Sequence, residues 1–375
     1  MQYNIKTEHI VLYSFAMHRK TALTWSWLGV LTKPRYDAIS EIYGNLDDAL
    51  AQIGAEFLKG LGCRQDTIEK ALTRLEGFDA AKYEAELLKR GINFLDLEDE
   101  AYPARLREIG DPPIFLYYRG DLSVLDQPCI ALVGTRKMSS YGKRVTEHFT
   151  ESFVRAGVVT VSGLALGIDA EVAKVTLGVS GRTVAALGHG LGMIYPKSNS
   201  RLADEIVAKG GLLLSEFPLD QAPDTYTFPA RNRIIAGLTL GTVVLEAPAE
   251  SGAIITADLA LDYNRDLFVV PGQIFDENYS GSHALISRGN AKLVMDPTDV
   301  LQELGIVAPK STTASAYVPL NADEARLMAL LTTMPQPVDS LVEKSALTAG
   351  KVSALLTMME LGGAVKNVGG GWVRS

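Results

Sequence analysis

Four consecutive residues in the middle of the chain, Gly134, Thr135, Arg136 and Lys137, have the chemistry of a phosphate site. They follow an apolar run at 129–133 and precede a helical pattern. Amide groups at a helix start carry partial positive charge, and glycine lets a ligand approach the backbone closely. Arginine can donate two parallel hydrogen bonds to phosphate oxygens. On these residues alone, a phosphate site and a plain strand-to-helix turn with a surface arginine are equally good interpretations.

The elements that would position this turn are predicted from the hydrophobic pattern. Short apolar segments alternate with amphipathic helical segments over the central part of the chain. The predicted strands are 130–133, 158–161, 183–186, 211–215, 241–246, 266–270 and 291–294, and the predicted helices are 143–156, 169–176, 199–209, 230–236 and 254–263. Apolar strands alternating with helices indicate a sheet covered on both faces, hence an α/β, doubly wound domain.

Basic residues follow several of these strands. In a doubly wound sheet, ligands bind beyond the carboxyl ends of the strands. Arg136, Lys197, Arg231 and Arg233 all fall in such positions, among several glycine turns. We therefore predict that the four side chains converge on one edge of the sheet and form a polyanion site built of loops.

Some members of this set also have a purely structural interpretation. Arg231 and Arg233 can instead pair with Glu246 or Glu250. His189 lies in a glycine-rich loop without a second histidine or cysteine ligand close in sequence, which favours a loop residue over a metal ligand. We predict no metal site.

Composition limits the functional classes. The 375 residues carry a formal net charge of −8, which excludes a wholly basic nucleic-acid binder but not a local basic groove. Cys63 and Cys129 are far apart, so a disulfide framework or a cysteine zinc site is not expected. No apolar run reaches the roughly 20 residues of a membrane helix, and no signal peptide follows Met1. We expect no membrane span and a cytoplasmic setting.

Helical segments flank the central domain on both sides. Residues 1–91 contain short amphipathic helices, including a pair around Leu61 and Gly62 of helix-hairpin-helix type, for which packing or partner docking is favoured over DNA contact. Strands are expected at 92–95 and 114–121. A linker over 307–319 leads to a winged helix over 320–375. Its third helix has only Lys351 as a basic residue, which favours a protein contact over DNA reading.

The motifs of the central region resemble those of the bacterial DNA-processing protein A (DprA/Smf) family. The matching segments are 102–103, 111–113, 131–136, 139–142, 162–169, 188, 195–196, 215–216, 228–235, 246–247, 251–257 and 270–272. The resemblance implies a helical N-terminal domain (1–91), an extended Rossmann domain (92–306) and a C-terminal winged helix. One departure is His283, which stands where the family usually has an asparagine.

The resemblance also implies a function. Proteins of this family bind single-stranded DNA during natural transformation, so the resemblance implies the same activity here. It further implies that the protein protects incoming DNA, forms a homodimer through the Rossmann domain and loads the RecA recombinase. The family's phosphate turn maps to Gly134, Thr135 and Arg136, and its basic residue after Tyr-Pro maps to Lys197. It implies no catalytic residue and no cofactor. The candidate DNA-binding residues are Gly134, Thr135, Arg136, Lys137, Gly163, Lys197, Asn199, Arg231, Asn232 and Arg233.

Bases of the strand would stack on aromatic side chains. Tyr195, Phe217 and Phe228 are the candidates. The alternative function is a nucleotide-binding enzyme, since the run from Gly241 to Glu246 resembles the Gly-Thr-x-x-Glu signature of lysine-decarboxylase-like phosphoribohydrolases. However, the Pro-Gly-Gly expected before that signature is absent, and no Gly-x-Gly-x-x-Gly follows the first strand.

Overall fold

The computed structural model describes residues 19–307, 317, 319–332, 334–368 and 370–374. The chain divides into two compact units, Met1–Pro309 and Lys310–Ser375, and each is described by itself. Most of the predicted linker at 307–319 lies outside the described residues. Within the part of the chain that is described, every helix is too short or too polar to traverse a bilayer.

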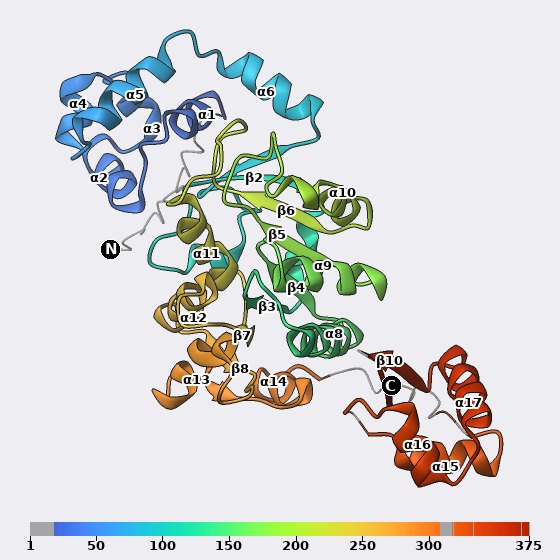
Figure 1. Cartoon of the computed structure of the whole chain (residues 1–375). Helices are drawn as coiled ribbons and strands as arrows, with labels where there is room; N and C mark the ends of the chain where they lie inside the picture. Colours follow the sequence, from blue (N-terminus) through green and yellow to red (C-terminus); the bar gives the residue numbers. More distant parts are fainter. Residues whose placement is uncertain (1–18, 308–316, 318, 333, 369, 375) are drawn as a thin grey trace, which may run out of the picture. The chain divides into compact units, whose positions relative to one another are not determined.

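The described residues of the first unit form a nine-stranded sheet in the order β1-β2-β6-β5-β4-β3-β7-β8-β9 (Figure 1). The strands are β1 (Asn93–Asp96), β2 (Phe115–Gly120), β3 (Cys129–Gly134), β4 (Val159–Ser162), β5 (Thr183–Ala186), β6 (Leu212–Ser215), β7 (Gly241–Glu246), β8 (Asp266–Val269) and β9 (Lys292–Leu293). From β6 to β9 the neighbours are parallel, whereas β2 is antiparallel to β6 and β1 to β2. All predicted strands are confirmed.

Helices cover both faces of this sheet, so the doubly wound α/β class is confirmed. They are α7 (Ala104–Arg107), α8 (Ser140–Arg155), α9 (Ile168–Gly178), α10 (Ser200–Ala208), α11 (Thr227–Gly237), α12 (Gly252–Asp262), α13 (Ser280–Ser287) and α14 (Pro297–Glu303). Alternate residues of β3 point to opposite faces. Ile130 and Leu132 pack in a cluster with residues of α8 and α14, whereas Ala131 and Val133 belong to the cluster that contains residues of α11 and α12.

The strand order reverses between β3 and β7. From β3 the chain moves outward through β4, β5 and β6, then returns to place β7 on the other side of β3. The connections on the two sides diverge there, which leaves a crevice at the carboxyl ends of these strands. A backbone hydrogen bond connects the ends of β3 and β7, because the Thr135 amide donates to the Glu246 carbonyl at 2.7 Å. A Cβ on Gly134 would lie 2.8 Å from that same carbonyl oxygen, so only glycine fits.

The N-terminal helices pack directly on the sheet. They are α1 (Arg19–Leu28), α2 (Lys33–Tyr43), α3 (Leu46–Leu50), α4 (Ala55–Gly60), α5 (Gln65–Leu75) and α6 (Ala80–Lys89). Trp25 is fully buried in a core shared with the sheet residue Tyr117, while Trp27 is only partly buried. The Ser26 hydroxyl lies 2.7 Å from that of Tyr117.

The hairpin between α4 and α5 does not offer free amides to a phosphate. The N–H groups of Leu61, Gly62 and Cys63 donate to carbonyls of the preceding helix at 2.9–3.0 Å. Its carbonyls are also engaged, since the Arg35 guanidinium donates to those of Leu61 and Gly62. This hydrogen bonding supports a packing role for the hairpin.

The second unit is a winged helix. Its described elements are α15 (Ala322–Leu330), α16 (Val338–Ser345), α17 (Ala349–Leu361), β10 (Val365–Val368) and β11 (Gly371–Arg374). The two strands form an antiparallel hairpin, and Leu341, Leu356 and Trp372 contribute to a separate core. Lys351, the basic residue of α17, lies 2.5 Å from the Asp323 carboxylate.

Candidate nucleic-acid interface

A crevice of about 1000 Å³ opens at the carboxyl ends of β3 and β7. One wall comes from the turn after β3 and from α11, and the other comes from the loops after β7 and β8. Six of the candidate DNA-binding residues line it: Gly134, Thr135, Arg136, Lys137, Arg231 and Asn232. The crevice therefore lies at the switch point of the sheet, where a doubly wound fold places its ligand.

Arg231 is the least expected component of this wall, because it is a buried cation. Only 4% of the residue is exposed, and its acidic neighbour is the buried Asp169, which stabilises the charge electrostatically. One nitrogen, Nη1, donates to the carbonyls of Gly163 and Ala186, at the ends of β4 and β5. Burial lowers the pKa of Arg231 to about 10, which still leaves it charged at neutral pH. Burial of a cation is costly even beside a carboxylate, so an anionic ligand at this place would add to the stabilisation that Asp169 provides.

The backbone around Arg231 is shaped to hold it. A Cβ on Gly163 would lie 2.4 Å from Nη1 of Arg231, so the glycine makes room for the guanidinium. The Gly163 amide donates to the Asp169 carboxylate at 3.1 Å. Asn232 accepts a hydrogen bond from Nε of Arg231 at 3.3 Å and donates to the Gly252 carbonyl at 3.2 Å, which links Arg231 to α12.

Arg136 and two aromatic side chains form the mouth of the site. The Arg136 guanidinium carbon lies 5.3 Å from the centroid of the Phe228 ring, and the Tyr195 ring lies 6.0 Å from Phe228 on centroids. All three line a smaller cavity, which shares Arg136 and Arg231 with the crevice. Arg136 and Lys137 are exposed and form no ion pair with a described residue. Two exposed cations beside rings suit a strand that presents phosphates and bases together.

His189 borders this smaller cavity as a structural loop residue. Its Nδ1 lies 3.0 Å from the Gly190 carbonyl, and its Nε2 accepts from the Tyr195 amide at 3.2 Å. This pattern fits the neutral tautomer with the proton on Nδ1, and burial lowers the pKa of His189 further. Among the described residues there is no cluster of three potential metal ligands.

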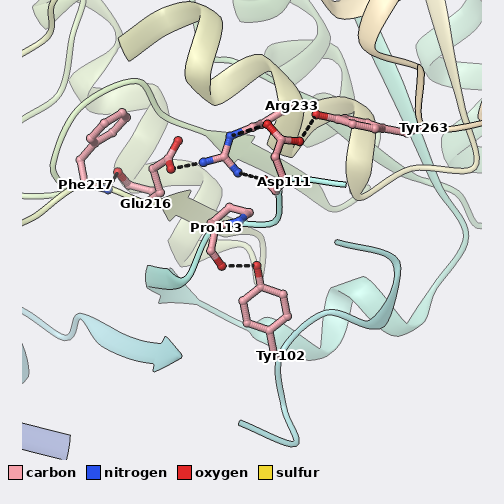
Figure 2. Close-up of polar contacts among 8 residues, drawn as sticks. Tyr102, Asp111, Pro113, Glu216, Phe217, Arg233 and Tyr263 are labelled. Atoms are coloured by element: carbon pink, nitrogen blue, oxygen red, sulfur yellow. Dashed lines mark hydrogen bonds and ion pairs between the residues drawn. The ribbon is translucent and has the colours of Figure 1, made fainter. Parts of the chain in front are cut away.

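The predicted convergence of four basic side chains is not fully reproduced, because Arg233 lies outside the crevice. Its guanidinium pairs with Glu216 and donates to the Asp111 carbonyl at 2.6 Å. Figure 2 shows Arg233 between these two residues, with Tyr263 donating to Asp111. Residues two apart on a helix point about 200° apart, so α11 directs Arg233 away from the side that carries Arg231. Its acidic partners are also not the predicted Glu246 or Glu250.

Three further candidates lie outside the lining of the two cavities. Lys197 is exposed, next to Pro196 of the smaller cavity. Asn199 is buried, and its amide donates to the Leu164 carbonyl at 2.9 Å, which is a structural contact. Phe217 lines a separate cavity with Trp25, against the N-terminal helices.

Glu246 does not face the crevice. It is fully buried, and its carboxylate accepts hydrogen bonds from the Ser139 amide at 3.1 Å and hydroxyl at 3.0 Å, under the start of α8. Burial raises the pKa of Glu246. The carboxylate is therefore a structural acceptor that orders the helix start.

The sequence analysis did not identify the wall opposite the arginines. Glu250 follows β7, and Glu277 and Ser280 follow β8. The signal was available, because these residues also come after the carboxyl ends of strands. Two of them are acidic, and a carboxylate does not suggest a contact with phosphate, so the prediction of a polyanion site left this wall out.

Comparison with known proteins identifies the family. Residues 93–305 match the model of DNA recombination-mediator protein A, and residues 311–371 match that of the DprA winged helix domain. The chain belongs to the DNA recombination-mediator protein A family. It is 38% identical to protein Smf of Escherichia coli (strain K12), over 75% of this chain and 77% of that protein.

Solved structures of this family support the same assignment. DNA processing protein A (DprA) of Streptococcus pneumoniae has 35% sequence identity and a TM-score of 0.61, over 76% of this chain and 95% of that chain. A structure of DNA processing protein A from Helicobacter pylori, which describes its single-stranded DNA binding mode, has 32% identity and a TM-score of 0.52. That match covers 57% of this chain and 95% of the other.

Proposed function

We propose that this protein binds single-stranded DNA through its phosphate backbone in the crevice. The observation that carries the proposal is the pair of cations that line the crevice, the buried Arg231 and the exposed Arg136, whose charges the one buried carboxylate of Asp169 offsets only in part. A DNA phosphate would neutralise the remaining charge. The single-stranded DNA binding of the Helicobacter pylori relative supports the choice of ligand.

The wider role proposed here rests on family membership. The protein protects incoming single strands and loads the RecA recombinase onto them, in natural transformation or in homologous recombination. Both steps would take place in the cytoplasm, where RecA acts. The candidate contacts are the side chains of Arg136, Lys137 and Arg231, since the amides of Thr135 and Lys137 already donate to the Glu246 carbonyl and the Thr135 hydroxyl. Exposed Lys197 would contact a longer strand.

A homodimer through the Rossmann domain is part of the proposal. Strand β9 is the last strand of the described sheet, so no other described strand pairs with its outer edge. Leu293 is 43% exposed on it, and Met295, just after it, is 76% exposed. Phe275, on the loop after β8, is 94% exposed. An open edge beside exposed apolar side chains suits a second copy of this chain.

We propose a binding protein and not an enzyme. The alternative hydrolase would need the Glu246 carboxylate beside the phosphate site. That carboxylate is fully buried and occupied by Ser139. It does not line the crevice, so its position does not favour the role in glycosidic cleavage that the alternative requires.

Two assays test this proposal with the full-length protein. Wild-type protein is titrated into a fluorescent 20-nucleotide single strand, and anisotropy is followed at several salt concentrations. We expect binding that weakens steeply with salt, and its absence at low salt would refute the proposal. RecA loading is tested by following RecA filament formation on strands that carry a single-strand-binding protein. We expect faster assembly when this protein is added, and an unchanged rate would refute the loading role alone.

A further inference from the structure

The two walls of the crevice carry opposite charge. Arg136 and Lys137 lie after β3, and Arg231 contacts the ends of β4 and β5. Glu250 lies after β7, and Glu277 lies after β8. Since the sheet order is β5-β4-β3-β7-β8, the charge changes from positive to negative across the switch point.

The carboxylates of the second wall are available to a ligand. Glu250 and Glu277 are exposed, line the crevice and form no ion pair with a described residue. Asp169 is the remaining acid of the lining, but it is buried, accepts a hydrogen bond from the Gly163 amide and interacts with Arg231 on the cationic side. Two free carboxylates therefore face a wall with three cations.

From this asymmetry we infer that Glu250 and Glu277 make the crevice selective for single strands over duplexes. The inference rests on the proposed binding of DNA in the crevice. A single strand has one phosphate backbone, which the cationic wall holds, and its unpaired bases turn to the acidic wall. There the carboxylates can accept hydrogen bonds from base amino groups.

A duplex cannot interact favourably with both the cationic and the acidic wall. Its two backbones border each groove, at a spacing of about 12 Å across the major groove and about 6 Å across the minor groove. If one backbone binds to Arg136 and Arg231, the other backbone of the same duplex would be directed towards the side of the crevice that carries Glu250 and Glu277. Like charges placed together at an interface suppress the wrong partner. In addition, the amino groups of paired bases are already hydrogen-bonded to the opposite strand.

The test compares Glu250→Gln/Glu277→Gln with the wild type in the full chain. Glutamine keeps the size of glutamate and removes the charge. Anisotropy titrations with a 20-nucleotide single strand and a blunt 20-base-pair duplex of the same sequence give the ratio of duplex Kd to single-strand Kd. We expect this ratio to fall about tenfold in the variant, chiefly through tighter duplex binding.

The matched control is Glu56→Gln/Glu76→Gln. Glu56 is on α4 and Glu76 directly follows α5; both are exposed, form no ion pair with a described residue and do not line the crevice. The control changes the net charge equally, so it measures the non-specific attraction of any DNA to a less acidic protein. A ratio that falls equally in both variants, or in neither, would overturn the inference while leaving single-strand binding intact. Failure of the wild type to bind single strands would overturn the proposed function itself.

Discussion

The guanidinium carbon of Arg136 lies 5.3 Å from the centre of the Phe228 ring. The contact joins the turn after β3 to the start of α11. It places a cation and an aromatic side chain together at the mouth of the smaller cavity. The ring can hold the arginine in place in the free protein and stack with a nucleobase in the complex.

Replacing Phe228 by alanine should therefore weaken single-strand binding. Base stacking contributes about 1–3 kcal/mol by alanine substitution, so we expect a loss in affinity of about 5- to 150-fold. Phe228→Tyr keeps an aromatic face and should bind within about threefold of the wild type. Anisotropy titration measures both variants. Equal affinities for the alanine and tyrosine variants would show that Phe228 does not stack with DNA.

Gly163→Ala should displace Arg231. The added Cβ would lie 2.4 Å from Nη1 of Arg231, a distance that the buried guanidinium can relieve only by moving. We expect a lower melting temperature and at least tenfold weaker single-strand binding. Gly178→Ala is the control, because a Cβ there meets no atom within 4 Å and alanine favours helix α9. If Gly163→Ala behaved like this control, the packing of Arg231 on Gly163 would not matter.

The Arg233–Glu216 pair should stabilise the fold without contributing to binding. The side chains are only 16% and 15% exposed. Glu216→Ala leaves the Arg233 charge without this partner, which costs about 3–5 kcal/mol of unfolding free energy in buried pairs. The control Glu86→Ala removes an exposed partner of Arg90 and should leave the free energy of unfolding close to that of the wild type. Urea denaturation measures both, and similar losses would contradict the prediction.

Much of the fold could be predicted from the sequence because each element has a strong local pattern. The strand at 130–133 is a continuous apolar run, the strand at 241–246 has three apolar residues in a row (243–245), and the turn at Gly134 is marked by residue type. The crevice then followed from a general rule of doubly wound sheets. The roles of individual polar side chains depend on packing between distant elements. Asn199 illustrates this, because its contact with Leu164 joins residues 35 positions apart.

The direction of side chains on α11 was partly predictable. Arg231 and Arg233 cannot share one face of a helix, so the helical geometry already argued against their convergence. The sequence could not show which of the two faces the crevice, since that depends on how α11 lies on the sheet. The partners of Arg233 were also hidden, because Asp111 and Glu216 are distant in sequence.

Asp96 should make the stability depend on pH. Burial, with the nearby charge of Asp99, raises the pKa of Asp96 to about 6. The folded protein thus holds this proton more tightly than the unfolded chain, so stability falls as pH rises from about 4 to about 6. Asp96→Asn removes the charge and keeps an acceptor for the Glu98 amide. We expect the variant to be about 1–3 kcal/mol more stable than the wild type at pH 7.5, with the difference vanishing near pH 4. Chemical denaturation across this range checks it, and a difference that does not change with pH would contradict it.

The most direct test of the central claim is a comparison of Arg136→Ala with Arg182→Ala in single-strand binding. Arg182 is exposed and precedes β5, at the opposite edge of the sheet, so the two variants lose the same charge at opposite ends of the strands. Affinity for a 20-nucleotide strand is measured by anisotropy over a series of salt concentrations. Arg136→Ala should bind at least about tenfold more weakly, with a salt slope reduced by about 0.7, while Arg182→Ala should match the wild type. Equal affinities and slopes for the two variants would show that DNA phosphates do not bind in the crevice.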